Sequence, residues 1–125
     1  MDHSTPPPKA PQVLSNAKTT YVYWLEIYRR IPKPERFGIG ERLDKLFLDL
    51  LETLFECRFS SRRDKSDLLD KSIKILDKIK FLTEVLWESK LVKTTYYSEL
   101  LLKVNVIGKE LGGWKKMIVK TPDLN

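Results

Sequence analysis

The sequence contains one cysteine and one histidine in 125 residues. Because Cys57 stands alone, no disulfide can form within the chain, and we expect it to be a small buried hydrophobic residue. His3 precedes a run of prolines, so a fold-held Ser-His-Asp triad, a Cys–His pair or a His/Cys metal cluster is not predicted. Glu52 and Glu56 lie one helical turn apart, but a di-iron bundle needs Glu-x-x-His motifs. We therefore predict a non-enzymatic protein with no catalytic residues, no metal, no cofactor and no small-molecule substrate.

Long apolar runs are also missing. The uninterrupted apolar stretches are only a few residues long, which excludes a membrane-spanning helix. The first residues, Met1-Asp2-His3 followed by prolines, lack the basic-then-apolar layout of a signal peptide. We therefore expect a cytoplasmic protein without membrane association.

Glycine is scarce, with five residues in the chain, yet three of them fall within six positions, at Gly108, Gly112 and Gly113. The surrounding apolar residues step by three and four, as expected for one seam of a long helix: Tyr97, Leu100, Val104, Ile107, Leu111, Trp114 and Ile118. Each interior helical glycine costs about 1 kcal/mol relative to alanine. Close approach of a neighbouring helix at Gly108 and Gly112 explains that cost, and we interpret Gly108, Gly112, Gly113 and Trp114 as a helix-packing motif.

The glycine spacing also admits a phosphate-binding loop, because Gly108 and Gly113 are separated as in G-x-x-x-x-G-K-[ST]. Trp114 and Lys115 stand where that motif requires Lys and Ser or Thr. No strand pattern precedes the glycines either, so packing is the favoured interpretation.

The apolar periodicity predicts one all-α domain. We expect a flexible Pro-rich tail at 1–18, a four-helix bundle at 19–120 and a C-terminal tail at 121–125. The four predicted helices run from Thr19 or Thr20 to about Arg30, across Leu43–Phe55, from after Asp64 to about Ser89, and from Thr94 or Thr95 to Thr121-Pro122. Short links favour an up-down-up-down topology. The apolar coverage of the first and third helices exceeds what one small bundle hides, which indicates a homo-oligomer.

Several short motifs resemble the Avd-like four-helix-bundle family, over roughly Thr19 to Ile118. They are an Ile-Pro at the end of the first helix, Arg36-Phe37-Gly38-Ile39-Gly40-Glu41-Arg42-Leu43, Lys80-Phe81-Leu82, and Ile107-Gly108-Lys109-Glu110-Leu111-Gly112-Gly113-Trp114. The family is named after the accessory variability determinant of diversity-generating retroelements and is related to four-helix proteins encoded in ribosomal RNA intervening sequences. The resemblance implies a homopentameric barrel with a basic surface that binds the element's reverse transcriptase and its RNA.

The charge balance supports a polyanionic partner, since 23 basic residues face 17 acidic ones, for a net charge of +6. The candidate residues for binding nucleic acid or a partner are Arg58, Arg62, Arg63, Lys71, Lys74, Lys78, Lys115, Lys116 and Lys120. Lys71, Lys74 and Lys78 form a stripe at one-turn spacing. Asp67, Asp70 and Asp77 interleave with it, so a solvated face of ion pairs is an equal interpretation. Whether the remaining clusters merge into one surface stays open.

Two functions follow from these observations. The first is a non-catalytic, oligomeric accessory protein that binds RNA and a reverse transcriptase during mutagenic retrohoming, as the resemblance implies. The alternative is a structural or adaptor bundle that binds only protein, or a ribosomal RNA intervening-sequence protein of unknown role.

Overall fold

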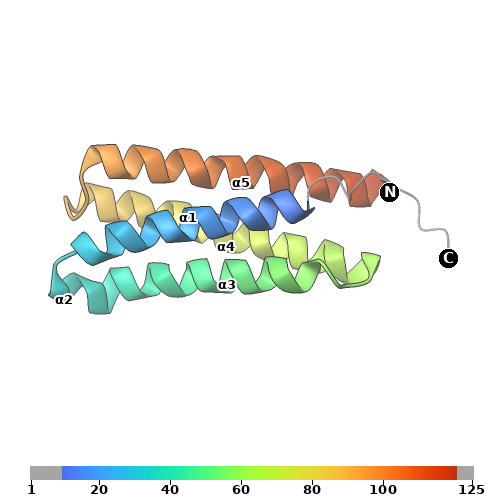
Figure 1. The fold of residues 1–125 in the computed structure, drawn as a ribbon, viewed down its shortest axis with the longest axis horizontal. Helices are drawn as coiled ribbons and strands as arrows, with labels where there is room; N and C mark the ends of the chain where they lie inside the picture. Colours follow the sequence, from blue (N-terminus) through green and yellow to red (C-terminus); the bar gives the residue numbers. More distant parts are fainter. Residues whose placement is uncertain (1–9, 121–125) are drawn as a thin grey trace.

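A computed structural model describes residues 10–120 of the chain, and this part contains helices and no strand (Figure 1). The elements are α1 (Ala10–Arg30), α2 (Lys33–Glu35), the π-helix η1 (Arg36–Gly40), α3 (Glu41–Cys57), α4 (Arg62–Glu88) and α5 (Thr94–Lys120). The predicted all-α bundle of four long helices is confirmed. No helix within residues 10–120 is long and apolar enough to cross a membrane.

The four long helices are antiparallel to their neighbours in sequence and close into a bundle. Contacts join α1 to α3, α3 to α4, α4 to α5, and α5 back to α1. In Figure 1, α5 runs along the top, α3 along the bottom, and α1 in front of α4. The start of α1, the α3–α4 link and the end of α5 therefore meet at one end of the bundle, and the other two links meet at the opposite end.

Helix α1 begins at Ala10, nine residues before the predicted start at Thr19, so residues 10–18 belong to the bundle. Val13 and Ala17 are fully buried and extend the core face of the helix by two turns. The amide of Asn16 donates to the Glu110 carboxylate of α5 at 2.9 Å. The proline within this stretch is the second helical residue, where no intrahelical N–H is needed. Residues 1–9 and 121–125 of the two predicted tails lie outside the described residues.

The connection after α1 is mostly helical, through α2 and η1, where the sequence predicts a link at 31–40. Arg36 holds this connection against the end of α1. Its guanidinium donates to the carbonyl oxygens of Ile31 at 2.7 Å and Arg29 at 2.6 Å. Carbonyls at the end of a helix lack intrahelical donors, so the arginine satisfies them and its position is structural.

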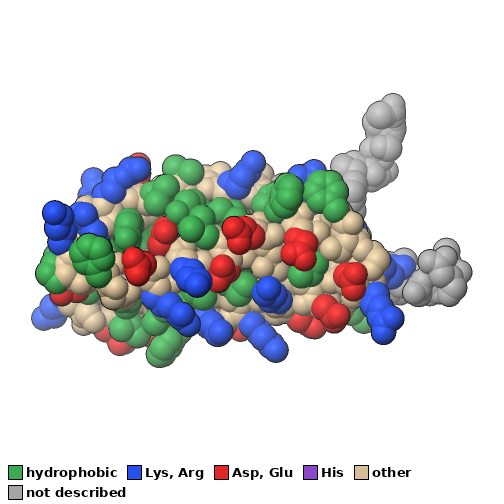
Figure 2. Space-filling view, turned by 90° about the horizontal axis from the view of Figure 1, so that it is seen from below, with side chains coloured by type: hydrophobic (Ala, Val, Ile, Leu, Met, Phe, Trp, Pro, Cys, Tyr) green, Lys and Arg blue, Asp and Glu red, His purple; other side chains and the backbone are tan. Residues whose placement is uncertain are grey.

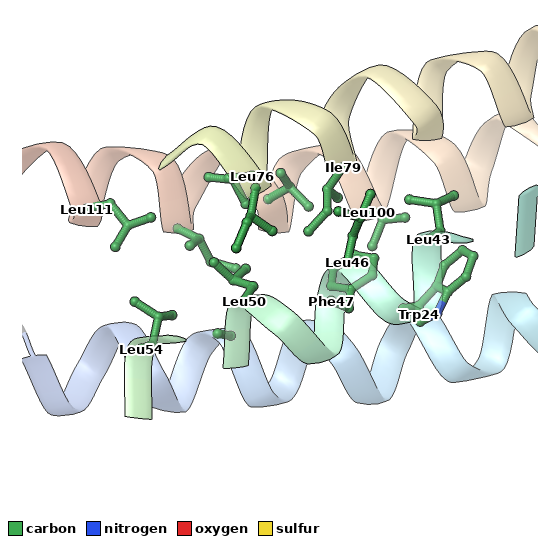
Figure 3. Close-up of a cluster of buried hydrophobic side chains, with 14 of the residues drawn as sticks. Trp24, Leu43, Leu46, Phe47, Leu50, Leu54, Leu76, Ile79, Leu100 and Leu111 are labelled. Carbon is green, nitrogen blue, oxygen red and sulfur yellow. The ribbon is translucent and has the colours of Figure 1, made fainter. Parts of the chain in front are cut away.

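The core runs the length of the bundle between the four helices, and Figure 3 shows a cluster of its buried side chains. From α3 it takes Leu43, Leu46, Phe47, Leu50 and Leu54, all of which are buried as their spacing predicts. The same spacing places Phe55 on this face, but its side chain is 56% exposed. At 100° per residue, Phe55 lies at the edge of the apolar stripe, outside the space enclosed by the neighbouring helices.

The predicted seam of α5 is confirmed for Leu100, Val104, Ile107, Leu111 and Trp114, which are buried, whereas Tyr97 and Ile118 at its two ends are half-buried. The glycines lie within this helix, as predicted. A β-carbon on Gly108 would lie 3.4 Å from Cδ2 of Leu76 on α4, whereas β-carbons on Gly112 and Gly113 would meet nothing within 4 Å. The predicted close approach at Gly112 is therefore not seen within residues 10–120 and stays a prediction for contact with a second chain.

Candidate nucleic-acid interface

A basic groove of about 300 Å³ lies between α3 and α4. Helix α4 contributes Lys71, Lys74 and Lys78, the three lysines of the predicted stripe. Helix α3 contributes Arg42 and Lys45 from the opposite wall. All five side chains are exposed at the surface. The packing of the two helices thus brings five cations to one groove.

The charge of this groove is largely uncompensated by acidic groups. Asp49 is the single acidic residue among those that line it. None of the five cations forms an ion pair with an acid in residues 10–120. In Figure 2, acidic side chains lie in a row along the middle of the face, and several basic ones lie below that row as drawn.

The acids that interleave with the lysine stripe form no ion pair with it among the described residues. Asp67 and Asp77 are exposed and do not line the groove. Asp70 forms its ion pair with Lys115 of α5 and does not line the groove. The interpretation of the stripe as a lysine–aspartate ion-pair network therefore finds no support among the described contacts, and Lys71, Lys74 and Lys78 remain available to an external anion.

Sequence reasoning missed Arg42 and Lys45 as members of this site. Their spacing of one turn on the polar edge of α3 is the signal that the sequence offers. That signal is weak by itself, because most basic residues on helix surfaces are simply solvated. Only the register between α3 and α4 shows that these two residues face the lysines.

The other predicted basic residues gather at the bundle end where α3 and α5 finish and α4 begins (Figure 1). Arg58 follows α3, its guanidinium carbon 5.2 Å from the centre of the Phe59 ring. Arg62 and Arg63 form the first turn of α4, which Ser61 caps by accepting from the N–H of Asp64 at 3.3 Å. The α3–α4 link and the last turns of α5 therefore lie at the same end of the bundle.

The basic side chains at this end of the bundle differ in how far they are exposed and in whether they already form an ion pair. Arg63 and Lys116 are exposed, whereas Arg62 is half-buried. Lys115 pairs with Asp70 across the α4–α5 interface. Lys120 is the last residue of α5, and its side chain lies outside the described part of the chain. The helix-packing residue Trp114 is 7% exposed, so it belongs to the core and offers no binding surface.

The groups with raised pKa values are Tyr21, Tyr23 and Cys57, and none of them lines the α3–α4 groove. Burial raises the pKa of the Cys57 thiol to about 11, and its Sγ lies 3.8 Å from the Lys65 carbonyl oxygen. Burial, followed by the hydrogen bond to Asp44, raises the pKa of Tyr21 to about 12. Both shifts favour the neutral form, which is the opposite of what an activated nucleophile needs. No group of three or more His, Cys, Asp or Glu side chains within residues 10–120 is arranged to hold a metal ion.

Comparison of the chain with known proteins finds no matching family model and no matching curated protein.

Proposed function

We propose that the protein is a non-catalytic accessory factor that binds RNA through the α3–α4 groove. The observation that carries the proposal is the grouping of Arg42, Lys45, Lys71, Lys74 and Lys78 around a groove with one acidic residue. Lys and Arg side chains at this density neutralise successive phosphates and release condensed counterions. Such contacts position a nucleic acid but read little sequence, so we expect weak sequence preference.

Assembly into a homo-oligomer would multiply this attraction. The chain exposes large apolar side chains on α3 and just after it, with Leu48, Phe55 and Phe59 exposed by 39%, 56% and 71%. Apolar surface of this kind favours association with a further chain. Five copies, the number that the Avd-like resemblance implies, would carry about +30 in total. In that setting the partner protein is a reverse transcriptase, and the RNA is the template that it copies.

The experiment compares two triple variants with the same change in net charge. In the groove variant, Lys71, Lys74 and Lys78 are replaced by glutamine. In the control, Lys18, Lys33 and Lys109 are replaced, since these lysines are exposed and line neither described cavity. Binding of unrelated single-stranded RNAs is measured by fluorescence anisotropy at several salt concentrations.

We expect the groove variant to bind all the RNAs more weakly. Its slope of log K against log salt should become shallower by about 0.7 for each phosphate that the variant no longer neutralises. The control should keep most of the affinity. Equal decreases in affinity in the two variants would show that only net charge matters, and the groove would have no specific role.

The exposed apolar side chains Leu48, Phe55 and Phe59 favour a second candidate of a different class, an adaptor that binds only protein. Wild-type protein with no affinity for any RNA at low salt would exclude the first proposal. Failure to bind a protein partner after Phe55→Ser and Phe59→Ser substitution would then support the adaptor. A neighbouring reverse-transcriptase gene flanked by near-identical repeats would favour the RNA-binding accessory factor, whereas a locus within a ribosomal RNA gene would favour the intervening-sequence alternative.

A further inference from the structure

A second and larger cavity, of about 1040 Å³, opens at the bundle end opposite the Arg63–Lys116 cluster. It lies between the end of α1, the end of α4, the 89–93 link and the start of α5. Its apolar wall includes Ile27, Leu91 and Val92. This cavity is separate from the groove between α3 and α4, because the two share no lining residue.

A fixed aromatic ring forms part of this cavity. The indole of Trp87 stacks on Tyr97, with ring centroids 4.8 Å apart and an angle of 10° between planes. Its N–H donates to Oγ1 of Thr94 at 3.0 Å, which ties the end of α4 to the start of α5. The ring lines the cavity and is 36% exposed. With one ring face packed on Tyr97 and the N–H already satisfied, the part of Trp87 that remains exposed is positioned aromatic surface on which a base can stack.

Cationic side chains line the same cavity as this ring. Arg30, Lys90 and Lys93 line the cavity together with one acid, Glu88. The guanidinium carbon of Arg30 lies 5.0 Å from the centre of the Tyr96 ring, which also lines the cavity. The combination of an aromatic surface and an excess of positive charge fits a ligand that is both planar and anionic.

The backbone at Lys90 adds an independent observation. Lys90 has a φ of 62°, the left-handed conformation, and no other described non-glycine residue has a positive φ. Its N–H donates to the Trp87 carbonyl at 2.9 Å, and that of Leu91 to the Leu86 carbonyl at 3.2 Å, which makes a Schellman motif at the end of α4. Glycine adopts this position without steric cost, whereas lysine adopts it under strain. Backbone strain of this kind clusters at functional sites, and here it places a cation on the cavity wall.

We propose that this cavity binds an unpaired nucleotide of RNA, with the base stacked on Trp87 and the phosphate near Lys90, Lys93 and Arg30. The inference rests on the proposed RNA-binding function and adds to it a site for single-stranded RNA. Stacking tolerates every base because each has a π-face, so the site would not select a sequence. A base inside a duplex cannot reach it, so the site favours single strands.

Tryptophan fluorescence provides a direct test on the full chain. Of the three tryptophans, Trp24 and Trp114 are 0% and 7% exposed, so quenching by a stacked base reports on Trp87. The probes are adenosine 5′-monophosphate and a single-stranded oligoribonucleotide, with ribose 5-phosphate as the probe that lacks a base and dodecanoate as an apolar anion. We expect saturable quenching by the first two and none by ribose 5-phosphate. No quenching, equal quenching by ribose 5-phosphate, or tighter binding of dodecanoate would overturn the proposal.

Variants separate stacking from charge. Trp87→Leu should weaken binding of the oligoribonucleotide by roughly 5- to 150-fold, whereas Trp87→Phe keeps a stacking ring and should retain most of the affinity. Lys90→Gly removes a cation from the cavity wall and also relieves the backbone strain at this position, so the variant should stay folded. It should raise the melting temperature and weaken nucleotide binding several-fold. Unchanged nucleotide affinity in both Trp87→Leu and Lys90→Gly would overturn the proposal.

The groove variant distinguishes this inference from the proposed function. Replacing Lys71, Lys74 and Lys78 with glutamine should weaken binding of the oligoribonucleotide but leave quenching by adenosine 5′-monophosphate unchanged. Quenching by the mononucleotide in a protein that shows no salt-dependent RNA affinity would remove the groove function and keep the nucleotide site. Salt-dependent RNA binding without quenching would keep the groove function and remove the nucleotide site.

Discussion

The ring of Tyr28 lies against the backbone of Gly40, so that a β-carbon on Gly40 would be 3.0 Å from Cε1 of Tyr28 and 3.4 Å from the carbonyl oxygen of Glu35. Tyr28 also packs on Trp24, with ring centroids 5.8 Å apart. This contact docks η1 and the start of α3 against α1. Gly40 is therefore the glycine whose lack of a side chain the fold uses most directly.

Replacing Gly40 with alanine should destabilise the protein by about 1–3 kcal/mol, since the Tyr28 ring, 3.0 Å from the added β-carbon, must move. Gly38 in the same π-helix is the matched control, because a β-carbon there would meet nothing within 4 Å. Gly38→Ala should be neutral or stabilise by up to about 1 kcal/mol. Chemical denaturation measures both changes, and equal stability of the two variants would contradict the assigned role of Gly40.

The glycines of α5 allow a test of assembly. Because no atom of the described chain lies within 4 Å of a β-carbon on Gly112, a leucine there has room within one protomer. If a second copy packs on the helix at Gly112, Gly112→Leu should overpack that contact, cost about 1–3 kcal/mol and lower the mass measured by light scattering. Gly113→Leu, 100° around the helix, is the control and should leave the mass unchanged. An unaltered mass in Gly112→Leu would mean that this face is not an interface.

Periodicity allowed the helices and most of the core to be predicted from the sequence. The seam of α5 was found because Leu100, Val104 and Ile107 recur with helical spacing, which depends on neighbours in sequence only. The start of α1 was missed because Val13 and Ala17 stand among polar residues and next to a proline. Their burial depends on α5, through contacts such as Asn16 with Glu110, that a single-helix pattern does not contain.

The candidate sites were less predictable than the fold. The lysine stripe of α4 could be found by spacing, but Arg42 and Lys45 become part of one surface only through the register of α3 against α4. The cavity at Trp87 depends on three segments that meet at a bundle end. The left-handed backbone of Lys90 has no signature in the sequence, because glycine or asparagine is the usual residue there.

The alkaline stability of the protein should depend on Tyr21. Its hydroxyl donates to Oδ1 of Asp44 at 2.8 Å, and burial together with this bond raises its pKa from 10.0 to about 12. The unfolded chain ionises first, so the stabilising effect is complete below pH 10 and is lost as the pH rises toward 12. The free energy of unfolding of Tyr21→Phe should therefore decrease less than that of the wild type between about pH 10 and pH 12, the range set by these pKa values. Parallel decreases in the two proteins would contradict this assignment.

Cys57 should be unreactive in the folded protein. Its side chain is fully buried, and burial raises the pKa of the thiol to about 11, so little thiolate forms at neutral pH. A thiol reagent such as 5,5′-dithiobis(2-nitrobenzoate) should label it slowly in buffer and rapidly in concentrated guanidinium chloride. Fast, complete labelling of the native protein would show that the α3 end opens readily.

Whether the basic cluster at the end of the bundle binds RNA can be tested by comparing its exposed residues with those that are half-buried or already paired. Arg63 and Lys116 are exposed at the end where α4 begins and α5 finishes, whereas Arg62 is half-buried and Lys115 pairs with Asp70. If this end binds RNA, replacing Arg63 and Lys116 with glutamine should weaken binding to unrelated RNAs alike, because side chains that bind phosphate do not read sequence.

The slope of log K against log salt in the Arg63→Gln, Lys116→Gln variant should fall by about 0.7 for each phosphate that is left without a cationic partner. The matched variant, Arg62→Gln with Lys115→Gln, has the same change in net charge but should change the slope less, because Lys115 already pairs with Asp70. Anisotropy titrations at several salt concentrations measure both. A larger change in the matched variant, accompanied by lower stability, would mean that this end acts through the packing of α4 against α5 and does not bind phosphate.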